Sequence, residues 1–150
     1  MAKLTRILIA YILATVTAGL CTSVLATQIA MQNLIDLGAS IPLSARFQAT
    51  RDDLAGFAFA FILVTAIGFL LALPLARWTA HLIGGFRSMA FVLGGYLGSA
   101  AALTAVTLLQ YQLLGDTVVP SISEPAGIAF AAIGGALGGW VFSVITRARR

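Results

Sequence analysis

Four long apolar stretches alternate with more polar ones along this chain. The apolar stretches cover residues 7–28, 54–75, 88–109 and 126–145, and none of them contains Asp, Glu, Lys or Arg. Each is about as long as the roughly 20 residues that a helix needs to cross the hydrocarbon core of a bilayer. We therefore predict an all-α integral membrane bundle of four transmembrane helices, which forms a single domain over residues 1–150.

The polar stretches carry signals for where helices stop and start. Gly38 is placed to end the first helix, and Pro42 allows a short new turn. Thr50 followed by Asp53 has the spacing of a capping box, which predicts that the second helix begins there. The sequence Ser123-Glu124-Pro125 is typical of an N-terminal cap, here for the fourth helix.

Composition supports the membrane interpretation. Hydrophobic residues make up 60% of the chain and charged residues only 9%, against about 25% charged residues in an ordinary soluble domain. The N-terminus has a basic start and an apolar run, as a signal peptide does, but the run is longer than a signal core and predicts a retained helix.

The net charge of +4 is distributed unequally between the two sides of the predicted bundle. The side that holds both termini has seven Lys and Arg residues and no acid: Lys3, Arg6, Arg77, Arg87, Arg147, Arg149 and Arg150. The other side has two arginines and all five acids. The positive-inside rule therefore predicts that both termini lie in the cytoplasm. No basic cluster is interleaved with aromatic residues, so we expect no nucleic-acid partner.

Small residues recur along one face of several predicted helices. Residues of this kind spaced four apart let helix backbones approach closely in lipid, where the hydrophobic effect does not hold helices together. The expected packing or partner-interface positions are Gly19, Ser23, Gly94, Gly98, Ala102, Gly127, Gly134, Gly135, Gly138 and Gly139. We expect the fourth helix to pack on the third, with one side of its double-width glycine surface left for a partner or a second copy.

Residues that would carry catalysis or ligate a metal are missing from the pattern. His81 is the single histidine and Cys21 the single cysteine, and the acids are expected on the side opposite His81. There is no phosphate-binding glycine loop, HExxH motif or nucleophile elbow. The sequence predicts no enzyme, no metal site and no cofactor. The first outer loop offers one polar cluster as a secondary contact: Arg46, Arg51, Asp52 and Asp53.

The segments "IPLSARFQATRDDLAGF", "AIGFLLALPLA" and "GGALGGWVF" make the chain similar to uncharacterised small four-helix inner-membrane proteins of proteobacteria. That resemblance implies a bacterial inner-membrane location and brings no catalytic or binding residues with it.

Two functions fit these features. The first is a non-enzymatic accessory or assembly subunit, which binds a larger membrane complex through its Gly/Ala helix faces. The second is a small homo-oligomeric channel or carrier for a small solute, with hydroxyls such as Ser99 and Thr104 lining its path. Both predict membrane lipids and other subunits, or further copies of the chain, as partners. A membrane enzyme or cofactor carrier is the remaining possibility.

Overall fold

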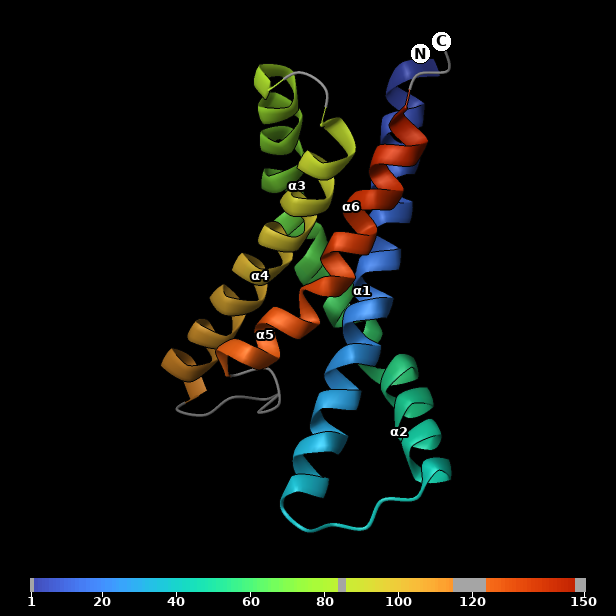
Figure 1. The fold of residues 1–150 in the computed structure, drawn as a ribbon, viewed down its shortest axis with the longest axis vertical. Helices are drawn as coiled ribbons and strands as arrows, with labels where there is room; N and C mark the ends of the chain where they lie inside the picture. Colours follow the sequence, from blue (N-terminus) through green and yellow to red (C-terminus); the bar gives the residue numbers. More distant parts are fainter. Residues whose placement is uncertain (1, 84–85, 115–123, 148–150) are drawn as a thin grey trace.

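The computed structural model describes residues 2–83, 86–114 and 124–147, and helices and turns account for all regular structure in these ranges. The helices are α1 (Ala2–Asp36), α2 (Leu43–Gly56), α3 (Ala58–Ile83), α4 (Arg87–Leu114), α5 (Pro125–Ala131) and α6 (Ile133–Thr146). Figure 1 shows that α1 begins and α6 ends at the same end of the bundle.

Four spans within these helices are long and apolar enough to cross a membrane: Leu4–Asp36, Ala58–Leu82, Arg87–Leu113 and Pro125–Thr146. The predicted all-helical fold with four helices of membrane length is therefore confirmed. Each span extends beyond the range that the apolar pattern predicts at one end or both, but α3 begins at Ala58 and not at Leu54, which lies in α2. The excess is largest for α1, whose 35 residues measure about 52 Å against a hydrocarbon core of about 30 Å. In a membrane, one end of α1 would therefore project from it.

The expected stop of the first helix at Gly38 is present. Gly38 has a φ of 94°, a backbone conformation that glycine adopts without strain. Its N–H donates to Ile35 O at 2.8 Å, and the Ala39 N–H donates to Leu34 O at 3.0 Å. These two bonds form a Schellman motif, which pairs carbonyls that the end of α1 would otherwise leave unpaired.

The predicted helix start at Thr50 is wrong. Thr50 lies in the interior of α2, which begins directly after its N-cap residue Pro42 and continues to Gly56. The helix is interrupted at Phe57 instead, and α3 begins at Ala58. The physical reason is that Thr50 and Asp53 bind side chains of α1, as described below, so neither acts as a local cap.

The predicted fourth helix is divided at Ala132. The Ala132 N–H donates to Ile128 O at 2.9 Å, and its own carbonyl accepts from the Ala136 N–H at 3.2 Å. Backbone bonding therefore continues through the break, and Figure 1 shows α5 leaving the axis of α6. Glu124 takes the N-cap position of α5 with Pro125 in the first turn, while Ser123 lies outside the described residues.

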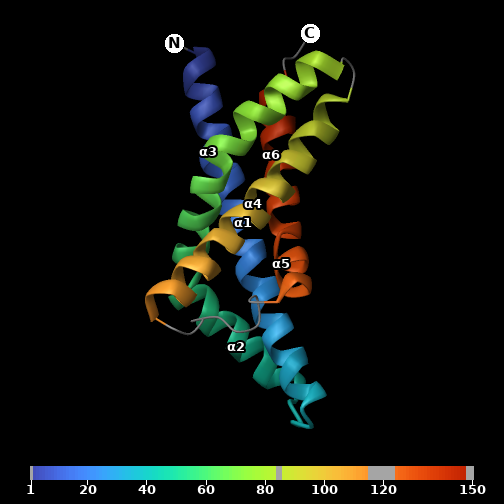
Figure 2. The ribbon, with the colours of Figure 1, turned by 90° about the vertical axis from the view of Figure 1, so that its left-hand side faces the viewer.

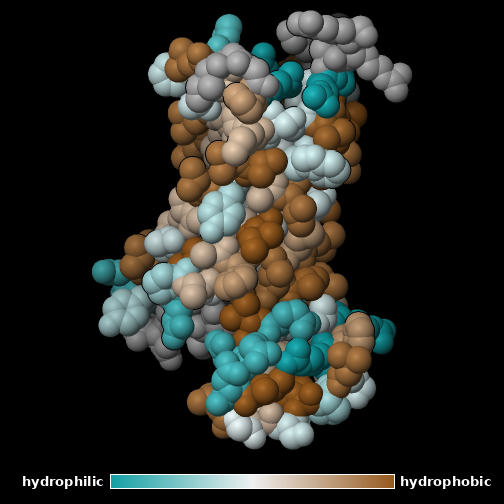
Figure 3. Space-filling model, viewed as in Figure 1, coloured by the Kyte–Doolittle hydropathy of each residue, from teal (hydrophilic) through white to brown (hydrophobic). Residues whose placement is uncertain are grey.

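Helix α6 packs between α1 and α4, and α3 packs against α4 and α1 (Figures 1 and 2). Small residues dominate the interior, among them Ala10, Ala14, Ala18, Ala131 and Ala132, with a few large ones such as Phe69 and Phe91. Large aliphatic side chains cover the outside, as the brown surface over the middle of the molecule in Figure 3 shows. This arrangement suits a bundle whose outer surface meets lipid tails rather than water.

Candidate functional site

The double-width glycine surface of α6 is occupied on both sides within the chain. Gly134 and Gly138 face α1: a Cβ atom on Gly138 would lie 2.5 Å from Ala14 O and 2.7 Å from the Ala18 Cβ. Gly135 and Gly139 face α4, where a Cβ on Gly139 would meet the Phe91 carbonyl. All four glycines are buried. Neither side of this surface is left open to a partner in this structure.

Helix α1 meets its neighbours through two faces, of which the small-residue pattern identified one. Gly19 lies on the identified face, and a Cβ there would lie 2.6 Å from the Ile62 Cα of α3. Ser23 on the same face is fully buried, and its Oγ has no hydrogen-bond partner among the described residues. The face that sequence reasoning missed contacts α5 and α6 and consists of Ala10, Ala14, Ala18, Thr22 and Ala26. Its members are spaced four apart, so the same small-residue spacing could have identified this face.

Helices α3 and α4 also approach through small residues. A Cβ atom on Gly94 would lie 2.6 Å from the Ala76 Cβ, and one on Gly98 would lie 2.5 Å from the Ala72 Cβ. Gly68 completes the contact opposite Gly98 and half-buried Ala102. Gly127 lies apart from this group, buried in α5.

A groove of about 640 Å³ remains along the α3–α4 contact. Its floor is built of small residues: Gly68, Ala72, Ala76, Gly94, Gly98, Ala101, Ala102 and Ala105. Exposed leucines border it on both helices, including Leu71 on α3 and Leu97 on α4. We call this surface the α3–α4 groove. Gly98 and Ala76 are buried in the α3–α4 contact itself, and the small residues of this lining that stay exposed are Ala101 and Ala105.

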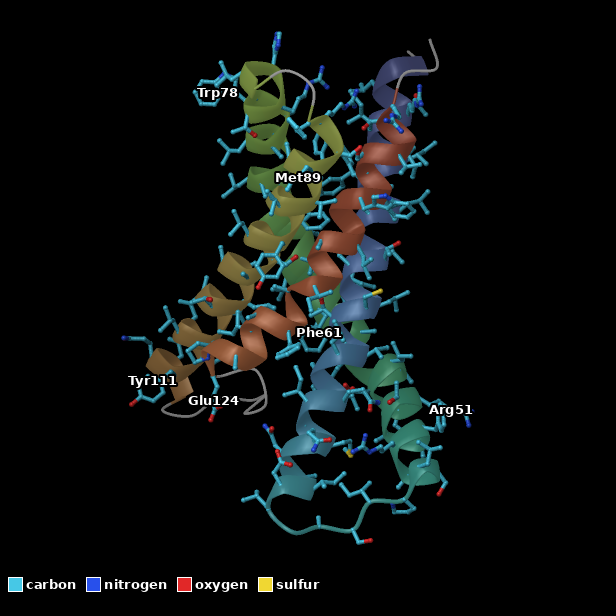
Figure 4. The ribbon with its side chains drawn as sticks, viewed as in Figure 1. Arg51, Phe61, Trp78, Met89, Tyr111 and Glu124 are labelled. Atoms are coloured by element: carbon cyan, nitrogen blue, oxygen red, sulfur yellow. The ribbon has the colours of Figure 1, made fainter. Side chains whose placement is uncertain are left out.

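The outer-loop cluster is divided between two roles. Asp53 accepts a hydrogen bond from Thr27 Oγ1 of α1, and the Arg46 Nη2 donates to Gln32 Oε1 at 3.3 Å. Arg51 and Asp52 are exposed, and Arg51 points away from α1 in Figure 4. Thr50 Oγ1 accepts from Gln28 Nε2 at 3.0 Å. The polar residues of α2 therefore hold it against α1, which leaves Arg51 and Asp52 as the members of the cluster without a partner among the described residues.

Removing the Thr27 hydroxyl tests this attachment. Thr27→Val leaves the half-buried Asp53 carboxylate without its donor, and hydrogen bonds to charged groups contribute about 1.5–3 kcal/mol. We expect faster amide hydrogen exchange in α2 and unchanged exchange in α4 and α6. Thr104→Val is the matched control, because the exposed Thr104 hydroxyl donates only to Ala100 O of its own helix. Wild-type exchange in α2 of the Thr27 variant would contradict this account of the attachment.

The hydroxyls considered as pathway lining do not share a surface. Thr104 lies on the outside of the bundle. Ser99 is buried where α4 meets Gly135 of α6, and its Oγ has no partner among the described residues. Ser143 Oγ donates to Ser88 Oγ at 3.0 Å and so links α6 to α4.

No group of three His, Cys, Asp or Glu residues that could hold a metal ion occurs in the described ranges. His81 lies on α3 at the end of the bundle where α1 begins, among basic residues that the sequence indicated only as topology signals. Comparison of the chain with protein-family models, curated proteins and solved structures finds no match.

Proposed function

We propose that this chain is a non-enzymatic accessory or assembly subunit of a larger membrane complex, which it contacts through the α3–α4 groove. The observation that carries the proposal is the groove itself. Its lining consists largely of small residues, and leucines lie along its edges. A floor of this kind admits the side chains of another helix to close range, which is how helices associate in lipid. Within the groove, Gly98 and Ala76 are buried between α3 and α4, so Ala101 and Ala105 are the small residues open to another helix, whereas the α6 glycines are already covered by α1 and α4.

The proposed location is the bacterial inner membrane, with both termini in the cytoplasm. The charge asymmetry between the two ends supports this orientation. The exposed Arg51 and Asp52 would then lie outside the cytoplasm, where they offer a secondary contact. Arg51→Cys, placed in a background with Cys21→Ala, should react in intact cells with a thiol reagent that does not cross membranes. His81→Cys should react only after the cells are opened. The reverse pattern would overturn the orientation.

The subunit proposal is tested by mild extraction of the tagged protein and by the mass and protein content of the resulting particle. We expect a stoichiometric complex with at least one other membrane protein. Ala101→Trp should displace that partner, because it fills an exposed position in the groove. Ala129→Trp is the control, since Ala129 is exposed on α5 outside the groove. Both variants should keep wild-type thermal stability.

A particle that contains only copies of this chain would overturn the subunit proposal and favour the channel or carrier. In that case Ser99→Ala or Thr104→Val should change solute flux into liposomes. The side-by-side positions that such a pathway needs are not present in one chain, because Thr104 faces outward and Ser99 faces α6. Thr104 would have to meet the lumen at a contact between copies.

A further inference from the structure

Helices α1 and α3 diverge toward the end of the bundle that holds the start of α1, as both Figure 1 and Figure 2 show. The divergence leaves a crevice of about 700 Å³ between them, with Phe91 of α4 and Thr146 of α6 also in its lining. Pro74 lies inside α3 and lines this crevice. A proline in a helix interior removes a backbone hydrogen bond and bends the helix, which gives a physical cause for the divergence.

The crevice is basic. Arg6, Arg77, His81 and Arg87 contribute to its lining, and none of its lining residues is acidic. The described acids Asp36, Asp52, Asp53 and Glu124 lie on segments at the opposite end of the bundle. An anion in the crevice would therefore meet several positive groups and no carboxylate from the described residues that line it.

The three arginines differ in how much of their bonding capacity is used. Arg6 donates from Nε to Ile145 O at 2.7 Å and from Nη2 to Arg147 O at 2.5 Å, so it holds the end of α6. Arg87 donates from Nη2 to Thr146 O at 3.0 Å, and its guanidinium lies 5.5 Å from the centre of the Phe91 ring. Arg77 has no hydrogen bond or ion pair with any other described residue. Its guanidinium is free to bind a ligand.

An apolar groove of about 530 Å³ continues from the crevice along the outer side of the α1–α3 contact. The two cavities share Ile7, Pro74 and Arg77, so Arg77 stands where the basic and apolar surfaces meet. Leu4, Leu8 and Leu70 are exposed along the groove, on the surface that lipid would cover. The Tyr11 hydroxyl donates to Ala66 O at 2.6 Å, which satisfies the one hydroxyl group in the groove lining.

We propose that the crevice and its groove bind one anionic membrane phospholipid. The phosphate binds Arg77, with His81, Arg87 and Arg6 around it, and an acyl chain lies in the groove against Leu70 and Phe69. The charge of the crevice is complementary to an anionic headgroup, and basic pockets between transmembrane helices are established sites for such lipids. The groove is apolar and lined by exposed leucines, which suits an acyl chain. A zwitterionic lipid fills the same groove but offers no net negative charge.

The test compares lipid binding to the purified full-length protein by native mass spectrometry. The probes are phosphatidylglycerol and phosphatidylcholine with identical acyl chains, with glycerol phosphate as the headgroup alone. We expect phosphatidylglycerol to be retained at least about fivefold more than phosphatidylcholine, and Arg77→Gln to remove about that factor. Arg77→Lys should keep most of the preference, because it keeps the charge. Leu70→Trp should lower retention of both lipids, because it fills the groove.

Two matched controls accompany these variants. Arg51→Gln removes an exposed arginine at the opposite end of the bundle and should leave the preference unchanged. Leu63→Trp changes an exposed leucine of α3 that lines neither cavity, and it should not lower retention. Equal retention of the two lipids, or equal loss in Arg51→Gln and Arg77→Gln, would overturn the proposal. Binding of glycerol phosphate as tightly as phosphatidylglycerol would also overturn it, since the site would then recognise a free anion.

Discussion

Gly138→Leu is expected to separate α6 from α1 and to lower the stability of the bundle more than any substitution on its outer surface. The Cβ atom alone would lie 2.5 Å from Ala14 O and 3.0 Å from the Phe69 ring. Backbone atoms cannot rotate away as a flexible side chain can, and a leucine adds three further carbons beyond that Cβ. Overpacking of a close contact costs about 1–3 kcal/mol or more, and we expect the upper end here. Thermal unfolding in a mild detergent measures the effect.

Leu137→Ala is the control for this variant. Leu137 is the preceding residue and is 45% exposed on the outer side of α6, so its truncation should change the unfolding free energy by about 0.5 kcal/mol or less. Equal melting temperatures for Gly138→Leu and wild type would disprove the close contact between α1 and α6.

Gly139→Ala is expected to destabilise the protein although it is the smallest possible substitution there. The added methyl group would meet the Phe91 carbonyl, with its carbon at 2.9 Å, and the Gly95 Cα at 3.3 Å. Alanine is the better helix former by about 1 kcal/mol, so helix propensity alone predicts a gain. We expect the contact with α4 to outweigh that gain and to leave a net loss of about 1–3 kcal/mol.

Gly56→Ala is the control for this variant, because it is expected to change stability in the opposite direction. Gly56 ends α2, and a Cβ there would meet nothing within 4 Å. Gly56→Ala should therefore be neutral or stabilising by about 0.4–1 kcal/mol, through a less flexible unfolded chain. If both alanine variants stabilised the protein to the same extent, α4 and α6 would not be in the contact described.

The four long apolar helices were predictable because uncharged apolar runs of this length are typical of transmembrane helices and rare in soluble domains. Gly38 was predictable as the end of α1 because its conformation depends on local backbone sterics. Thr50 and Asp53 led to the wrong prediction of a helix start because their hydrogen bonds are to α1, about two dozen residues earlier in the chain. A tertiary hydrogen bond of this kind cannot be recognised from the local sequence pattern.

The glycine positions were predictable as close-contact sites, but their neighbours were not. The spacing of the glycines predicts that another helix packs closely there. Only the arrangement of the helices shows that Gly134 contacts α1 while Gly135 contacts α4. The basic crevice was not predictable for a related reason. Arg77 and Arg87 fit the role of topology signals in the sequence. They line one crevice together with Arg6 only because α1 and α3 diverge, which the sequence does not indicate.

The small-residue interior has a consequence for the entropy of this bundle. Alanine and glycine have no side-chain rotamers to lose on burial, whereas a leucine or methionine interior would lose up to about 1–2 kcal/mol for each residue ordered. Weak dispersion contacts can therefore hold these helices together without opposing a large side-chain entropy term. The same interior has few rotamers that could switch between states. Movement in the core of this protein must then consist of whole helices shifting against one another.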